Sequence, residues 1–161
     1  MTMKSLSMAG TLRRLCFVLA VQGSVGSVMA QAESSSTKED AVNTETEIIL
    51  DIDGSIVHVS LEDSAATRDF LAQLPLTLSF GDYHGIEKVS DLPSRLSTEG
   101  APAGFDPQVG SFTYYAPWGN LAIFYRDFGY SRSLVNLGTV TSGLEHLSQS
   151  DSFTATISVA R

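Results

Sequence analysis

Alternation of apolar and polar residues predicts two short strands near the start of the folded part of the chain. The two runs are residues 47–51 and 55–61, and Asp53-Gly54 between them is a strong signal for a two-residue hairpin turn. Successive side chains of a strand point to opposite faces. One face of the second run is therefore expected to belong to the core, namely Val57, Val59 and Leu61.

After this hairpin the spacing of apolar residues changes to a helical period. Over residues 65–74 the residues that recur at helical spacing are Ala66, Phe70, Leu71 and Leu74. Ser64, which follows two acidic residues, suits an N-cap, and Pro75 cannot continue a helix. The pattern predicts a short amphipathic helix between these two residues.

Strand-like alternation returns over residues 76–80, with Gly81-Asp82 as the expected turn and a short strand at 86–89. Glycine and proline are frequent from 83 to 110 and leave room for only two elements there, the strand at 86–89 and one turn of helix expected at 92–96. A long irregular stretch in a compact domain usually covers a site or a core edge. We therefore expect residues 97–110 to form the rim of a pocket.

Residues 110–126 form the most informative stretch of the chain. Two runs rich in aromatic and β-branched residues flank the five-residue connection 116–120, which predicts a β-hairpin whose loop carries Trp118. Core packing is the expected role of three rings in these runs, Phe112, Tyr114 and Phe124. A tryptophan in a turn is harder to explain by packing, so for Trp118 packing and ligand contact remain equally open.

Two further strands are expected in the C-terminal part, at residues 134–140 and 153–159. A polar connection at 127–133 precedes the first, and a short turn or helix at 142–147 separates them. Seven or eight strands with a single clear helix predict an all-β barrel or sandwich.

The N-terminal residues are not expected to belong to this domain. Residues 1–30 have basic residues before a short apolar core and small residues after it, which is the order of a secretory signal peptide. Cleavage after Ala30 is the first choice, and cleavage after Ala32 the second. Residues 31–45 are polar and acidic, as expected of a flexible tether. The protein is thus expected to be exported, periplasmic or secreted, with one domain at residues 46–161.

Charge and cysteine content narrow the possible partners and chemistries. Cys16, the single cysteine, lies in the expected signal peptide, so the mature chain would have neither a disulfide nor a thiol nucleophile. Removal of residues 1–30 leaves 7 of the 10 basic residues against all 18 acidic ones, a net charge of about −11. Such a chain is a poor partner for nucleic acid and for anionic membrane surfaces.

No pattern of residues predicts a particular reaction. The histidines, at positions 58, 84 and 146, are too scattered for a metal motif, and no G-x-S-x-G elbow is present. Carboxylate pairs for glycoside hydrolysis can be drawn from many acidic residues, so any choice is arbitrary; the possible members are Glu87, Asp91, Glu99, Asp106 and Asp127. We expect neither a metal nor a cofactor.

Three segments resemble the bacterial cyclophilin-like fold proteins, a family of small single domains. They are Leu-Ser-Thr-Glu-Gly-Ala-Pro-Ala-Gly-Phe at 96–105, the hairpin text at 110–122, and Leu-Gly-Thr-Val at 137–140 followed by Ser-Gly-Leu at 142–144. The last is also similar to the Phe-Gly-x-Val-x-x-Gly-Met end of true cyclophilins. The resemblance spans roughly residues 46–160. It implies a closed eight-stranded antiparallel barrel with one or two short capping helices.

The resemblance implies less about activity, because function belongs to the site and not to the barrel. True cyclophilins carry an arginine in a Phe-His-Arg motif followed by Gly-Phe-x-x-Gln-Gly-Gly-Asp, and neither motif occurs in this chain. The arginine assists rotation about an X-Pro bond, whose uncatalysed barrier is roughly 20 kcal/mol. Arg95 or Arg126 could take the place of that arginine, but the spacing of the sequence supports neither. The resemblance therefore implies the fold and not a set of catalytic residues.

The leading hypothesis is an exported, non-catalytic binding domain for a small molecule or an extended peptide. Its pocket is expected between the 97–110 loop and the Trp118 turn, with these candidate residues: Glu99, Tyr115, Trp118, Asn120, Tyr125 and Arg126. A second hypothesis is a divergent peptidyl-prolyl isomerase that acts on secreted chains. A third is an assembly partner that uses an exposed strand edge. The sequence leaves the oligomeric state open.

Overall fold

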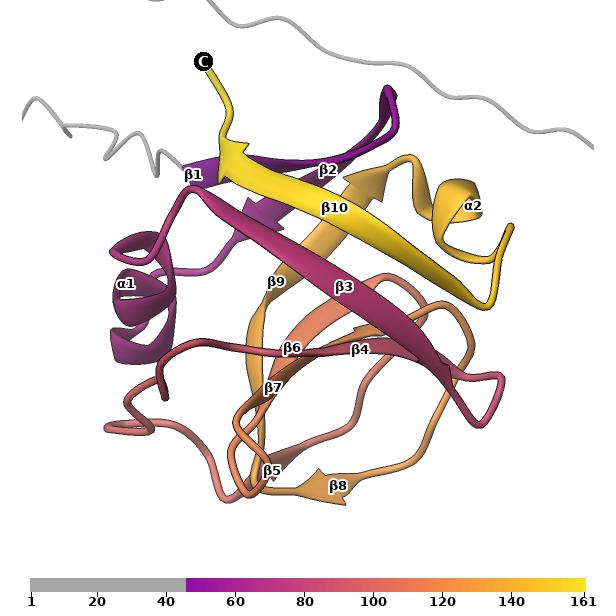
Figure 1. Ribbon diagram of the computed structural model, residues 1–161. Coiled ribbons are helices and arrows are strands. Elements are labelled where there is room, and N and C mark those ends of the chain that lie inside the picture. The colour runs from indigo at the N-terminus through magenta and orange to yellow at the C-terminus, as the bar shows by residue number, and fades with distance from the viewer. Residues whose placement is uncertain (1–45) are drawn as a thin grey trace, which may run out of the picture. The chain divides into compact units, whose positions relative to one another are not determined.

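The computed structural model of the protein describes residues 46–161 (Figure 1). The predicted signal peptide, Cys16 and the acidic tether lie outside the described residues. The described elements are β1 (Thr46–Ile52), β2 (Ser55–Leu61), α1 (Ala65–Leu71), β3 (Leu76–Tyr83), β4 (Glu87–Asp91), β5 (Gly104–Phe105), β6 (Ser111–Tyr115), β7 (Asn120–Phe124), β8 (Ser131–Arg132), β9 (Leu134–Ser142), α2 (Leu144–Leu147) and β10 (Ser152–Val159). Neither described helix has the length and apolar character needed to cross a membrane.

Eight of the strands close into an antiparallel barrel in the order β1-β10-β3-β4-β7-β6-β9-β2, in which β2 pairs with β1 (Figure 1). The short strands β5 and β8 form a separate pair. The predicted closed eight-stranded barrel is confirmed, and of the one or two short helices expected, two are present among the described residues. Closure also gives each of the eight strands two neighbours, so the barrel itself has no free strand edge.

The apolar residues form two clusters, one on each side of the barrel wall. The larger cluster fills the interior and includes Val57, Val59 and Leu61, as predicted, together with Phe112 and Tyr114. The smaller cluster lies on the outer wall and consists of Ala122, Phe124 and Leu134, with Ile86, Val89, Phe105 and Tyr115 packed against it. Phe124 is therefore a packing residue, as expected, but outside the barrel.

The first hairpin and the helix follow the sequence prediction closely. Asp53 and Gly54 both adopt positive φ in the β1–β2 turn, and the Ser64 hydroxyl accepts a hydrogen bond from the Thr67 amide at the start of α1. The helix ends at Leu71, three residues before the predicted end. Its last turn tightens there, because the amides of Gln73 and Leu74 bond to carbonyls three residues back.

The predicted turn at Gly81-Asp82 is wrong, because both residues lie within β3. The chain turns instead at His84-Gly85, where both residues have positive φ. The Asp82 carboxylate accepts a hydrogen bond from the Gly85 amide at 2.8 Å and so stabilises this turn. Asp82 thus supports the turn from inside the strand.

The helical turn predicted at residues 92–96 is also wrong, since this segment is irregular. Its polar groups bond to the β6–β7 hairpin instead of to each other. The Leu92 amide donates to the Gly119 carbonyl, the Leu96 amide to the Tyr114 hydroxyl, and the Arg95 guanidinium to the carbonyls of Ala116 and Pro117. Tertiary hydrogen bonds have replaced the local ones.

Candidate functional site

The pairing of strands brings a set of outward-facing side chains together on one part of the barrel wall. Glu87 of β4 lies opposite both Tyr83 of β3 and Phe124 of β7. Asn120 of β7 lies opposite Tyr115 of β6, which in turn lies opposite Leu134 of β9. Directly opposite residues share a face, so five strands contribute to one surface.

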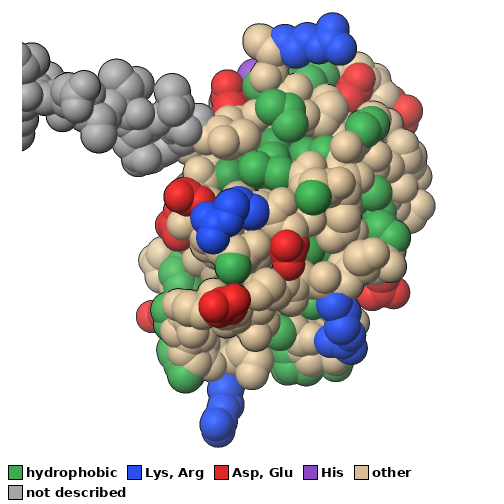
Figure 2. All heavy atoms as spheres, turned by 90° about the vertical axis from the view of Figure 1, so that its left-hand side faces the viewer, with side chains coloured by type: hydrophobic (Ala, Val, Ile, Leu, Met, Phe, Trp, Pro, Cys, Tyr) green, Lys and Arg blue, Asp and Glu red, His purple; other side chains and the backbone are tan. Residues whose placement is uncertain are grey.

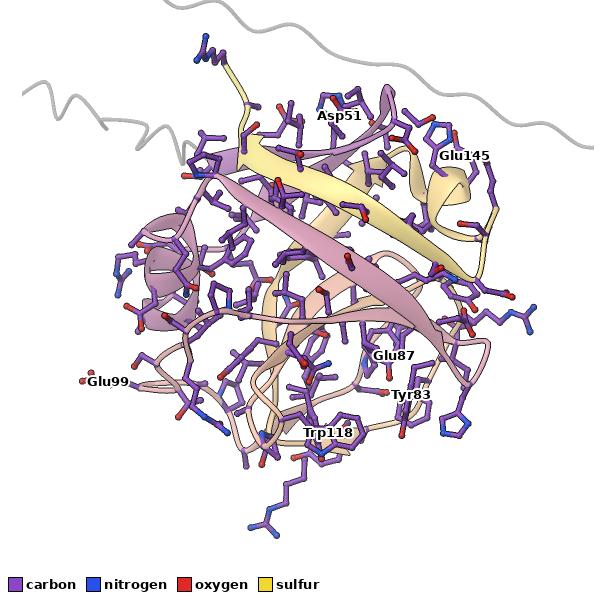
Figure 3. All side chains as sticks on the ribbon, in the orientation of Figure 1. Asp51, Tyr83, Glu87, Glu99, Trp118 and Glu145 are labelled. Atoms are coloured by element: carbon purple, nitrogen blue, oxygen red, sulfur yellow. The ribbon has the colours of Figure 1, made fainter. Side chains whose placement is uncertain are left out.

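This surface contains a pocket of about 190 Å³, which we name the Trp118 pocket. Aromatic and small apolar side chains make up most of its lining, and Glu87 is its single acidic residue. The lining residues are Tyr83, Glu87, Val89, Tyr115, Trp118, Asn120, Ala122, Phe124, Phe128, Ser131 and Leu134. Figure 3 shows Tyr83, Glu87 and Trp118 near one another, with Glu99 on a different side of the domain.

Trp118 stands at the mouth of this pocket with 58% of its surface exposed. Its ring meets the rings of Tyr83 and Tyr115 nearly at right angles, with centroids 5.7 and 5.4 Å away. Phe128, from the segment after β7, stacks on Phe124 at 6.0 Å. The tryptophan is thus held in place by edge contacts while most of its surface remains available to a ligand.

Two polar side chains of the pocket are poorly satisfied. Burial raises the pKa of the Glu87 carboxyl from 4.5 to about 7, and no ion pair with the described residues offsets this effect. Asn120 is only 4% exposed; its amide nitrogen donates to the Leu121 carbonyl, whereas its Oδ1 has no partner among residues 46–161. Buried polar groups without partners are uncommon, and strongly shifted pKa values cluster at functional sites.

Three of the six predicted site residues, Tyr115, Trp118 and Asn120, meet in the Trp118 pocket. Glu99 lies instead in a separate groove of about 400 Å³ between the loop at 99–105 and the start of α1. The loop predicted as the rim therefore lines this second groove and not the Trp118 pocket. On the face that carries α1, acidic and basic side chains lie in small separate groups with hydrophobic side chains between them (Figure 2).

Tyr125 lies at a different place, in a network around a buried lysine. Lys88, whose side chain is 2% exposed, donates to the Asp82 carboxylate at 2.9 Å and to the Ser150 carbonyl at 2.7 Å. The Tyr125 hydroxyl donates to the same carboxylate. Two hydrogen bonds lower the pKa of Asp82 to about 2, and the bond from Lys88 has a larger effect than the bond from Tyr125. Burial is the main cause that raises the pKa of Tyr125 to about 12.

Arg126, the last predicted site residue, is exposed and does not line the Trp118 pocket. Sequence reasoning missed Tyr83 and Phe128 and treated Glu87 as one arbitrary acid among several. The alternation of Glu87 with Val89 was a usable signal, because it places the acid on the same strand face as an apolar residue.

The three histidines have other contacts. His58 lies 2.9 Å from the Glu47 carboxylate, His84 packs edge-on against the Tyr83 ring, and His146 lies 3.8 Å from Glu145. Residues 46–161 contain no group of three or more side chains placed to hold a metal ion.

A closed eight-stranded barrel with its pocket on the outer wall defines the class of this protein as a cyclophilin-type β-barrel. The model of the Cyclophilin-like family matches residues 50–158, and the chain belongs to this family. The solution structure of a hypothetical protein from Archaeoglobus fulgidus is similar, with a TM-score of 0.54 and 13% identity over 72% of this chain and 95% of that one. This likeness concerns the fold alone. Comparison with curated proteins gives no match.

Replacing Glu87 with glutamine is expected to stabilise the protein at pH 8 by about 1–2 kcal/mol, allowing for partial exposure of the carboxyl. The folded pKa is about 7, above that of the unfolded chain, so the native state loses stability as the pH rises from 4.5 to 7. The glutamine variant lacks this loss. Urea unfolding at pH 4 and pH 8 measures the free energy of unfolding of the wild-type protein and of the variant.

At pH 4 the two proteins should differ little, because the carboxyl is protonated in both states. Asp91→Asn is the matched control, since Asp91 lies exposed on the same face of β4. A pH-independent effect of Glu87→Gln would contradict the buried-carboxyl explanation.

Proposed function

We propose that this protein is an exported cyclophilin-like domain that binds a small molecule or an extended peptide in the Trp118 pocket without catalysing a reaction on it. The observation that carries the proposal is the exposed Trp118 ring, held between two tyrosines at the mouth of an apolar pocket. Pockets of this kind, apolar with a few polar groups, are typical binding sites. Export depends on residues 1–30, whose pattern is that of a signal peptide.

The absence of a free cation in the pocket favours binding over isomerase activity. None of the arginines described at residues 46–161 lines the Trp118 pocket. The Arg95 guanidinium, which lies near the hairpin loop, is already bonded to the carbonyls of Ala116 and Pro117. An isomerase of the cyclophilin type needs a donor aimed at the proline amide, and we therefore rank this activity second.

The Trp118→Ala variant is expected to lose at least about tenfold in affinity for pocket ligands, because its ring supplies the exposed apolar surface. Ligand-observed NMR with a mixture of small fragments and short peptides would identify ligands of the wild-type protein and compare both proteins. The free energy of unfolding should change by less than about 1 kcal/mol, since the ring is mostly exposed.

Tyr130→Ala is the control for the loss of an exposed ring, since Tyr130 is 63% exposed and lies outside the pocket lining. Equal ligand binding by the Trp118→Ala variant, or a large loss of its stability, would contradict the proposal. NMR exchange spectra of X-Pro peptides at high protein concentration test the alternative; accelerated exchange would establish isomerase activity.

A further inference from the structure

We propose that the Trp118 pocket selects an organic ammonium group, with the Glu87 carboxylate as its counter-charge. This inference rests on the proposed binding function and names the ligand class. The ammonium belongs either to a small free molecule or to a lysine side chain in a peptide, because both present a cationic nitrogen on an alkyl chain to the pocket.

The aromatic rings supply the first part of the argument. The ring of Trp118 is nearly perpendicular to those of Tyr83 and Tyr115, and Phe128 adds a further ring to the lining. In an edge-to-face contact only one of the two rings loses part of a face, whereas stacking covers a face of each ring. Faces of Trp and Tyr rings attract cations, most strongly where water is excluded.

The charge in the pocket supplies the second part. Glu87 is the single charged residue among those that line it. Within residues 46–161 its carboxylate has no ion-pair or hydrogen-bond partner. An unpaired carboxylate in an apolar pocket is unfavourable, and a bound cation would remove that cost. The net charge of the chain, −8, also attracts cations toward the surface.

The shape of the site favours an organic cation over a metal ion. A metal ion requires several ligands at short distances, and the pocket offers a single carboxylate. The space of about 190 Å³ suits a small alkylammonium head. A neighbouring hollow of about 470 Å³ shares Tyr83, Glu87 and Phe128 and extends toward His84 and Ile86. The remainder of a longer ligand has room there.

Titrations of the full chain at pH 8 with matched probes test this inference. The cations are choline and N-acetyl-lysine methylamide, and 3,3-dimethyl-1-butanol is the neutral counterpart of choline. Trp118 is the single tryptophan of the chain, so its fluorescence reports directly on the pocket. Calorimetry provides a second measure, and equal concentrations of sodium chloride control for ionic strength.

At least one cation should bind, and 3,3-dimethyl-1-butanol should bind at least tenfold more weakly than choline if choline is the ligand. Glu87→Gln should weaken cation binding at least tenfold, and Asp91→Asn on the same face of β4 should leave it unchanged. Binding of choline but not of the lysine derivative indicates a quaternary ammonium head, and the reverse indicates the primary ammonium of a lysine side chain in a peptide.

The possible failures separate the two proposals. Equal binding of the neutral probe, or cation binding that is unaffected by Glu87→Gln, would overturn the ammonium inference and leave a Trp118-dependent binding pocket. The inference also fails if neither cation binds while fragments still bind through Trp118. If no probe or fragment binds in a Trp118-dependent way, the proposed function fails as well.

Discussion

The Asp82→Asn variant is expected to unfold with a free energy about 2–3 kcal/mol lower than the wild-type protein at pH 7. Asp82 is the carboxylate that faces the buried ammonium of Lys88 at 2.9 Å and also accepts from Tyr125. Asparagine keeps the size and one acceptor but removes the charge, so Lys88 would be left buried with only carbonyl partners. Chemical unfolding with urea measures the loss.

The pH dependence provides an independent check of this prediction. The folded pKa of Asp82 is about 2, below its ordinary value of 3.8, so its stabilising contribution is present above pH 3.8 and disappears as the pH falls through 2. The difference between the two proteins should therefore shrink toward pH 2. Asp127→Asn removes an exposed carboxylate and serves as control. An equally large loss in that control would contradict the explanation.

Replacing Gly138 with alanine is expected to destabilise the barrel by about 3 kcal/mol, or to prevent folding. Gly138 lies in β9 between β2 and β6. A Cβ atom at this position would overlap the Ser60 carbonyl oxygen and lie 2.9 Å from the Leu61 Cα. Both are backbone atoms of a paired strand, so neither can move without disturbing the barrel. Thermal and urea unfolding measure the effect.

Gly81→Ala is the matched control, since Gly81 also lies in a barrel strand. A Cβ atom there meets nothing within 4 Å, and the residue has no positive φ. Its substitution should leave stability unchanged or raise it by a few tenths of a kcal/mol, because alanine restricts the unfolded chain. Similar stabilities for the two variants would show that the close approach at Gly138 is tolerated.

Local patterns were sufficient to predict most of the fold. The hairpin at Asp53-Gly54 and the Ser64 cap depend on neighbouring residues, and both are confirmed. The wrong turn at Gly81-Asp82 and the wrong helix at 92–96 share one cause. In both places pairing with other elements determines the backbone. Gly81 and Asp82 pair with β4, and the segment at 92–96 forms hydrogen bonds to the β6–β7 hairpin.

The candidate site was harder to predict, because its residues come from strands that are distant in sequence. Tyr115, Trp118 and Asn120 belong to one hairpin and were found, whereas Tyr83 and Glu87 reach the pocket only through the pairing of β4 with β3 and β7. Tyr125 comes directly after β7 and two residues after Ile123, so its side chain lies on the same side as that of Ile123. There it contacts Lys88 and Asp82. No single-sequence pattern gives that register.

The division of the apolar residues between the two faces of the barrel wall has a consequence for evolution. Along β7, Leu121 and Ile123 belong to the interior, while Asn120, Ala122 and Phe124 line the Trp118 pocket. Adjacent positions in the gene thus meet different neighbours, so a substitution at Asn120 or Ala122 leaves the interior contacts of Leu121 and Ile123 in place. Selection can therefore act on the two faces of β7 separately.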